Sequence, residues 1–480
     1  MKDLTQRALD SAAFHGAKYA DIRIVQKQNQ SITVKNGKVK ALNENESLGF
    51  GIRVLVDGAW GFASSFLVEA KEIDRVARVA VGIARASASL RLRNVELGSP
   101  VVQVATYRTP IQIDPFAVSL EEKIALLLTA DASMRGAKNI VVAESGIECL
   151  RENTVFASSE GSYIEQEFIE TGCGIEAMAA DGSEVQRRSY PNSVGRHMGR
   201  EGYEFVGRQD LPGNARRIGE EASALLTAKQ CPSGVTTVIL DGTQVALQIH
   251  ESCGHPAELD RALGDEAAFA GTSFLTPDKL DKLRYGSQMV NISADATVPG
   301  GLGTFGFDDE GVPAQRIPIV KDGIFVGYLM SRETAAILGL ASNGTMRADG
   351  WNRIPLIRMT NVNIEPGQWT LADLISDTEE GIFMQTNSSW SIDDKRLNFQ
   401  FGTEIAWQIK NGQMRDMLKN ATYTGITPEF WGNCDAICNR DHWTVWGTPN
   451  CGKGQPVQVA HVSHGAAPAR FRQVRVGLMK

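Results

Sequence analysis

The chain has 480 residues, enough for two or more domains, and its 42% hydrophobic and 22% charged residues are typical of a large globular protein. A formal net charge of −7 argues against a nucleic-acid partner, because phosphate binding requires clustered lysine and arginine. No apolar run is long enough to span a membrane, and the seven scattered cysteines suit a reducing compartment, so we expect a cytoplasmic protein without a membrane partner.

The first part of the chain alternates helices with strands, which predicts an N-terminal α/β domain at residues 1–230. Two stretches share the order of a helix, a meander of strands and a helix, and each has an Asp-Gly turn late in its meander, at Asp57-Gly58 and Asp181-Gly182. Either one duplicated unit or two unrelated α/β meanders explain this order. Periodicity predicts helices at residues 4–14, 68–87, 120–135 and 215–228, and strands at residues 21–26, 31–42, 49–57, 140–150, 162–172 and 174–179.

The pattern shifts toward strands after Cys231, which predicts a C-terminal, mainly β domain at residues 231–480 and an α+β fold for the chain. Asp322-Gly323 and Asn411-Gly412 are dipeptides that favour hairpin turns. The glycine-rich stretch 300–306 lacks the Lys-Ser/Thr ending of a phosphate cradle, so we interpret it as a mobile loop at a cleft. A helix is expected within this domain at residues 241–257.

That helix contains two histidines and a glutamate within six residues, His250-Glu251-Ser252-Cys253-Gly254-His255. In zinc-peptidase helices the two histidines stand four residues apart and share one face. A spacing of five turns the rings about 140° apart on a regular α-helix. A shared metal site therefore predicts a local break of the helix, through a π-bulge that Gly254 tolerates or an early end at Pro256. The alternative is an ordinary capped helix whose histidines are satisfied polar groups.

Further motifs are spread over most of the chain. They are Gly49–Gly58, Ala59–Ser64, Glu258 with Asp260, Asp308–Gly311, Gly323–Tyr328, Arg358–Asn361 and Cys451–Lys453. With His250–His255, the order and spacing of these motifs resemble the TldD/PmbA family, and more closely its TldD branch, which keeps the His-Glu-x-x-x-His motif.

This resemblance implies a zinc-dependent metallopeptidase. The metal ligands that it implies are His250, His255 and Cys451, with Glu251 as the catalytic general base. It also implies short or unfolded peptides as substrates, bound as an extended strand within a dimer, which is either a homodimer or a heterodimer with a paralogue lacking the motif.

Elementary chemistry agrees with this ligand set. Two imidazoles and one thiolate leave one position of a tetrahedral zinc ion for water. These ligands are also consistent with another divalent metal. Gly447 and Gly452 predict a loop around Cys451 that approaches the helix closely. Candidates for stabilising the oxyanion are Arg358, His442, His461 and His464.

Two other interpretations are consistent with the sequence. A structural Cys3His zinc site formed by Cys434, Cys438, His442 and Cys451 competes for Cys451, although its spacing is poor and buried free cysteines explain these residues better. The chain is also interpretable as a non-catalytic partner subunit or a regulatory binding protein of the same family, against which the intact motif argues. Pro256-Ala257 and Asn387–Asp394 depart from the family pattern, which indicates that the residues lining the substrate cleft differ.

Overall fold

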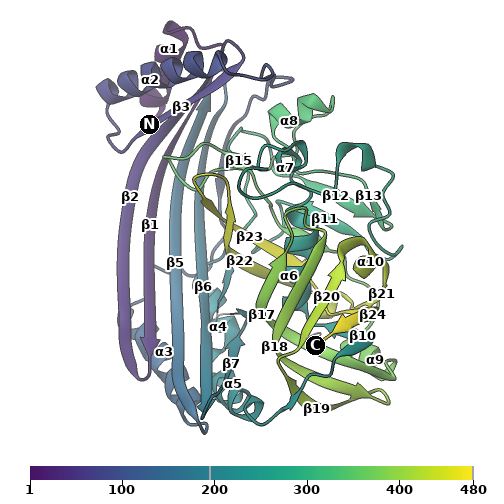
Figure 1. The fold of residues 1–480 in the computed structure, drawn as a ribbon. Helices are drawn as coiled ribbons and strands as arrows, with labels where there is room; N and C mark the ends of the chain where they lie inside the picture. Colours follow the sequence, from purple (N-terminus) through teal and green to yellow (C-terminus); the bar gives the residue numbers. More distant parts are fainter. Residues whose placement is uncertain (194–195, 478–480) are drawn as a thin grey trace.

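A long, curved N-terminal sheet stands beside a C-terminal part rich in short strands (Figure 1). The computed structural model describes residues 1–193 and 196–477. The expected α+β fold is confirmed, with the helices of the N-terminal part grouped on one face of its sheet. Among the described helices, none is both long and apolar enough to cross a membrane.

The N-terminal sheet has the order β3-β2-β1-β5-β6-β4, with β7 and β8 also paired to β6. Its long central strands pair antiparallel, and β1 is hydrogen-bonded to both β2 and β5. The strands are β1 (Tyr19–Lys35), β2 (Lys38–Val56), β3 (Ala59–Ser65), β4 (Val104–Arg108), β5 (Ile140–Ser158), β6 (Tyr163–Asp181), β7 (Glu184–Tyr190) and β8 (His197–Gly199).

These strands are longer than the sequence pattern predicted. The predicted strand at residues 31–42 is wrong, because the chain reverses inside it at Asn36-Gly37, where both residues have positive φ values of 48° and 78°. Some of the polar residues that interrupt the apolar pattern of β1 contact the C-terminal part. Lys27, for example, donates from Nζ to the backbone oxygen of Asp349 at 2.8 Å.

The helices cover one face of this sheet in two groups. One end of the sheet packs on α1 and α2 through residues such as Ile22 and Val76, and the other end packs on α3 and α5 through residues such as Ile32 and Leu127. The prediction for α3 is confirmed at both ends, whereas α5 begins four residues early because Asp210 caps it ahead of a proline. The helices are α1 (Lys2–Phe14), α2 (Ala70–Ala88), α3 (Leu120–Arg135), α4 (Glu204–Gln209) and α5 (Leu211–Leu225).

The two halves of the sheet repeat one order of elements. In each half a helix is followed by a long hairpin, a third strand and another helix, as in α1-β1-β2-β3-α2. Asp57-Gly58 joins β2 to β3, and Asp181 and Gly182 stand at the turn from β6 to β7. The halves meet where β1 and β5 pair antiparallel. This shared order favours the interpretation of a duplicated unit.

The C-terminal part is built around a second sheet with the order β17-β10-β24-β20-β18-β19-β9. The predicted hairpin turns are confirmed, since Lys321 pairs with Ile324 and Lys410 with Gln413. The strands are β9 (Lys229–Gln230), β10 (Gly234–Leu240), β11 (Ile292–Asp295), β12 (Arg316–Lys321), β13 (Ile324–Phe325), β14 (Met346–Arg347), β15 (Leu356–Ile357), β16 (Val362–Ile364), β17 (Glu380–Ile392), β18 (Asn398–Lys410), β19 (Gln413–Lys419), β20 (Thr422–Ile426), β21 (Cys434–Ile437), β22 (Thr444–Lys453), β23 (Gln458–Ala466) and β24 (Ala469–Val476).

Short helices connect these strands. They are α6 (Gly242–Ile249), a π-helix (His250–Gly254), α7 (Leu259–Leu263), α8 (Arg332–Ile337), α9 (Leu371–Ser376), α10 (Thr427–Gly432) and 3-10 turns at Pro277–Lys279 and Arg440–His442.

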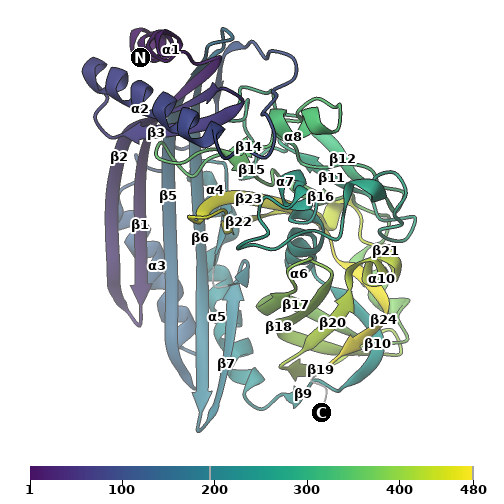
Figure 2. The same ribbon diagram turned by 45° about the horizontal axis from the view of Figure 1, so that its top comes forward.

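The hairpin of β22 and β23 extends from the C-terminal part toward the N-terminal sheet (Figure 2). Gly447 of β22 is needed there, because a Cβ at this position would lie 2.1 Å from the backbone oxygen of Met198 in β8. The prediction of a glycine loop around Cys451 is therefore wrong. Cys451 lies within β22, and Gly447 approaches β8 rather than the helix.

The glycine-rich stretch 300–306 also differs from its prediction as a mobile cleft loop. Leu302 and Thr304 are buried, the Gly303 amide donates to Asn361 Oδ1, and a Cβ at Gly303 would overlap the backbone of Thr360. The glycines here permit close packing against a neighbouring segment.

Candidate metal centre

The helix that carries the two histidines changes its geometry at the motif. Asp241 caps α6 by accepting a hydrogen bond from the Gln244 amide at 3.0 Å. From His250 to Gly254 the chain forms a π-helix, in which the His255 amide donates to the His250 oxygen at 3.1 Å. The predicted break of regular α-geometry is confirmed, and it has the π form.

Proline explains part of this distortion. In a regular helix the Ser252 oxygen would accept from residue 256, but Pro256 has no amide hydrogen. The Tyr285 hydroxyl donates to the Ser252 oxygen instead, at 2.9 Å. The Ser252 hydroxyl donates to the Gln248 oxygen at 2.5 Å and accepts from Trp431 Nε1 at 2.9 Å. Tyr285, from outside the helix, thus satisfies the backbone oxygen that Pro256 leaves without a donor.

Gly254 serves a different purpose from the one predicted. Its φ is not positive, so its backbone does not require glycine. A Cβ at this position would instead lie 2.0 Å from Met359 Sδ, and Met359 is fully buried. Gly254 therefore allows the segment of the Arg358–Asn361 motif to pack directly on the π-turn.

Replacing Tyr285 by Phe is expected to destabilise the protein by about 1–3 kcal/mol, because the buried Ser252 oxygen loses its donor. Urea unfolding measures this loss. Tyr328→Phe is the matched control, since the buried Tyr328 hydroxyl donates to the Leu275 oxygen at 2.6 Å, away from the π-turn. Both variants should lose stability, but only Tyr285→Phe should weaken the binding of added Zn²⁺, because Tyr285 supports the π-turn that carries the histidines. Wild-type Zn²⁺ affinity in a destabilised Tyr285→Phe protein would contradict this support of the metal centre by Tyr285.

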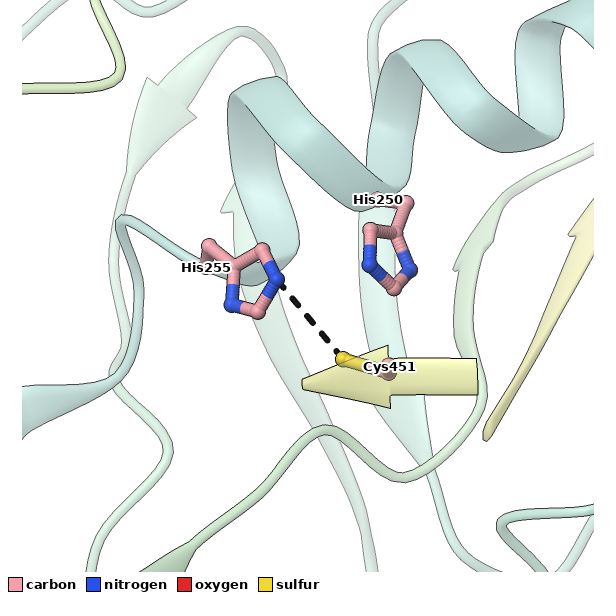
Figure 3. Close-up of side chains that lie close together, drawn as sticks. All are labelled: His250, His255 and Cys451. Atoms are coloured by element: carbon pink, nitrogen blue, oxygen red, sulfur yellow. Dashed lines mark hydrogen bonds between the residues drawn. The ribbon is translucent and has the colours of Figure 1, made fainter. Parts of the chain in front are cut away.

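The structure brings His250, His255 and Cys451 together, although His255 and Cys451 are 196 residues apart (Figure 3). One possible ligand atom from each residue lies within 4.8 Å of the other two. Cys451 Sγ is 3.6 Å from His255 Nε2, and the two imidazole rings are nearly perpendicular at 88°. A tetrahedral zinc ion with ordinary Zn–N and Zn–S bonds separates such a nitrogen and sulfur by about 3.6 Å, so the spacing of Cys451 and His255 fits the ion.

The hydrogen bonds around the rings determine which nitrogens remain free. His464 Nδ1 lies 2.9 Å from the Val362 oxygen and must donate to it, so His464 Nε2 is an acceptor. His250 Nδ1 therefore donates to His464 Nε2 at 2.8 Å. His255 Nδ1 likewise donates to Glu258 Oε2 at 3.1 Å. Both histidines thus keep an unprotonated Nε2 for a metal ion, with the supporting contacts that metal-binding imidazoles commonly have.

The charge states suit metal binding. Burial lowers the pKa of His250 and, further, that of His255, which keeps both rings neutral. Burial alone would raise the pKa of the Cys451 thiol, but the neighbouring His255 and Arg358 lower it below its usual value. Zinc binds the thiolate and neutral imidazoles, and the directions of these shifts favour those forms.

Glu251 has a partner that lies far away in the sequence. Arg396 Nη1 lies 2.5 Å from Glu251 Oε2, and both side chains are largely buried. Arg396 belongs to the turn between β17 and β18 and has a φ of 62°. Backbone hydrogen bonds from Thr272 and Phe274 to Asp394 and Lys395 hold this turn in place. No local pattern could have identified Arg396, because the contact spans 145 residues.

The candidates for oxyanion stabilisation have other partners. His464 orients His250, and Arg358 Nη1 and Nη2 donate to the backbone oxygens of Gln458 and Cys451. His461 lies on the face of β23 opposite to His464, and its Nδ1 is 2.5 Å from Oε2 of Glu170 in β6. His442 Nε2 accepts from the Leu371 amide. His464 and Arg358 thus contact two of the three clustered donors, His250 and Cys451. His461 and His442 contact other residues.

The alternative Cys3His site does not form. Within residues 1–193 and 196–477, the group of donors close enough to share an ion is His250, His255 and Cys451. Cys434 and Cys438 are buried free cysteines, and burial raises the pKa of Cys438 to about 12.

Comparison with known proteins agrees with this architecture. Three family models match the chain: PmbA/TldA metallopeptidase domain 1 at residues 20–84, the central domain at residues 113–229 and the C-terminal domain at residues 233–477. A metalloprotease of Methanocaldococcus jannaschii is 32% identical over 444 residues, which cover 92% of this chain and 94% of the relative. A relative in Saccharolobus solfataricus named as a zinc metalloprotease TldD homolog is 24% identical over 96% of this chain and 97% of its own length.

The fold is also shared with a solved structure. The crystal structure of TldE from Thermococcus kodakarensis has a TM-score of 0.78 at 16% identity and covers 99% of this chain and 100% of its own. The family models together account for most of the sequence, including the three clustered donors. The chain therefore belongs to the TldD/PmbA family, whose models are described as those of metallopeptidases.

Proposed function

We propose that this protein is a zinc-dependent metallopeptidase that hydrolyses short or unfolded peptides. The observation that carries the proposal is the convergence of two oriented imidazoles and one cysteine thiol next to Glu251. The names of its relatives, which include metalloproteases and a zinc metalloprotease, support it. Nitrogen and sulfur donors suit zinc, and another divalent ion is the alternative.

In this proposal His250, His255 and Cys451 hold the ion. A bound zinc ion supplies a Lewis acid that polarises the scissile carbonyl and lowers the pKa of coordinated water to about 7. Glu251 accepts the proton of the attacking water and delivers it to the leaving amine, as a general base and then a general acid. Arg396 holds the Glu251 carboxylate in a fixed orientation through the ion pair at 2.5 Å.

The proposal also includes the domains, the bound peptide, the oligomeric state and the compartment. Residues 231–480 form the catalytic domain and residues 1–230 the N-terminal domain. The peptide binds as an extended strand, so that main-chain hydrogen bonds carry most of the affinity and the sequence preference is weak. The active form is a dimer, either of two copies or with a paralogue that lacks the motif, and the free cysteines suit a reducing cytoplasm.

Metal analysis and a peptide digest test this function together. The purified protein, loaded with zinc or stripped by a chelator, is incubated with a mixture of unfolded peptides, and mass spectrometry detects new termini. We expect cleavage in the zinc-loaded sample, loss of cleavage after stripping and its return when zinc is added. A zinc-loaded protein that cleaves nothing, alone or mixed with its paralogue, would favour the non-catalytic partner instead.

A further inference from the structure

A buried cluster of charges lies next to the three clustered donors. Glu258 precedes α7, Asp260 and Arg261 lie in its first turn, and Lys453 is the last residue of β22. Lys453 is 1% exposed, Glu258 and Arg261 are 0% exposed, and Asp260 is 8% exposed, so these charges must be balanced inside the protein. The cluster contains two carboxylates and two cations and is neutral as a whole.

Lys453 connects two segments that are distant in sequence. Its ammonium group donates to both oxygens of Asp260, at 2.7 and 2.8 Å, and to the Ile357 oxygen at 2.8 Å. It also lies 3.4 Å from Glu258 Oε2, the same oxygen that accepts from His255 Nδ1. Lys453 thus reaches His255 through a single carboxylate.

The strand carrying Lys453 also carries Cys451. Residues two apart in a strand point to the same face, so Cys451 and Lys453 both face the segment that contains His255. The two segments are joined twice: by the contact of His255 with Cys451 at 3.6 Å, and by the contacts of Lys453 with Asp260 and Glu258. The covalent connection between His255 and Cys451 runs through almost two hundred residues and cannot fix their distance.

We propose that Lys453 is a positioning residue whose ion pairs with Asp260 and Glu258 hold Cys451 and His255 at the spacing that a metal ion requires. This inference rests on the metal centre of the proposed function. A buried ion pair is a weak source of stability, because well-packed apolar residues of similar size often replace it without loss. Its value at this place is geometric: it sets the position of the Cys451 strand relative to His255 before an ion binds.

The test is the zinc affinity of the full-length protein, measured by competition with a chromophoric chelator. The double variant Lys453→Met/Asp260→Asn removes one charge of each sign and keeps the cluster neutral. We expect it to fold and to bind zinc roughly 10- to 100-fold more weakly than the wild type, as for other residues that orient metal ligands. The absorption spectrum of the Co²⁺-loaded protein should show a weakened thiolate-to-cobalt band, which loss of stability alone would not produce.

Lys123→Met is the matched control. Lys123 is also fully buried, and its ammonium group donates to Gln30 Oε1 and the Pro115 oxygen, but it lies in the N-terminal part. This variant should keep wild-type zinc affinity and the wild-type cobalt spectrum. If the double variant does not fold, Asp260→Asn decides, since it preserves the shape of the side chain and should still lower the affinity measurably.

A folded variant with wild-type affinity and an unchanged cobalt spectrum overturns the role of Lys453. Because affinity is measured without any peptide, this result is separate from the failure of peptide hydrolysis. A wild-type protein that binds zinc but cleaves nothing leaves the positioning role standing, whereas one that binds neither Zn²⁺ nor Co²⁺ overturns both proposals.

Discussion

Replacing Glu251 by Gln is expected to lower the rate of peptide cleavage by roughly 10²–10⁴-fold while leaving zinc bound. The amide keeps the shape of the side chain and its oxygen can still accept the hydrogen bond from Arg396 at 2.5 Å, but it cannot take a proton from water. The measurement is the initial rate of cleavage of a peptide identified by mass spectrometry, together with the zinc content of the same sample.

Glu365→Gln is the matched control for this variant. Glu365 also pairs with an arginine, Arg316, at 2.7 Å, but this pair is exposed and lies outside the group of clustered donors. Its loss should leave both cleavage and zinc content near wild type, because exposed ion pairs contribute little. Cleavage by Glu251→Gln at a rate close to wild type would remove Glu251 from the proposed mechanism.

Replacing Cys451 by Ala is expected to lower zinc affinity by about two orders of magnitude or more. Loss of a residue that only orients a ligand typically costs 10–100-fold, and Cys451 is proposed to be a ligand itself. Zinc content after dialysis and chelator competition measure the effect. The reason for the large effect is that alanine offers the ion no donor, and the two histidines alone leave two positions to water.

Cys434→Ala and Cys438→Ala are the controls for this prediction. Both cysteines are buried, 2% and 0% exposed, so each variant should lose about 1 kcal/mol of stability from the small cavity and no zinc. Equal loss of zinc from all three variants would contradict the assignment of Cys451 as a ligand of the proposed catalytic zinc. It would instead favour a structural site that also uses Cys434 and Cys438.

Some of the remaining differences between prediction and structure have one physical cause. Hydrophobic periodicity reports local burial, and the sequence pattern predicted helices α2 and α3 to within about two residues. It failed in β1, where residues such as Lys27 are polar because they meet the C-terminal part rather than solvent. The glycine-rich composition of residues 300–306 predicts a mobile loop, but close packing against a neighbouring backbone explains Gly303 there. The division of the chain at residue 230 stays a prediction.

The sequence by itself determined that His250 and His255 could share an ion only if the helix broke, because a spacing of five residues is incompatible with one face of a regular α-helix. It also determined the family, from motifs spread along the chain. Only the tertiary structure decided which side chains complete the site: Arg396 beside Glu251, His464 behind His250, and Lys453 between Glu258 and Asp260. The physical reason is that these contacts join residues more than a hundred positions apart, and their geometry depends on how strands and turns pack in three dimensions rather than on any local period.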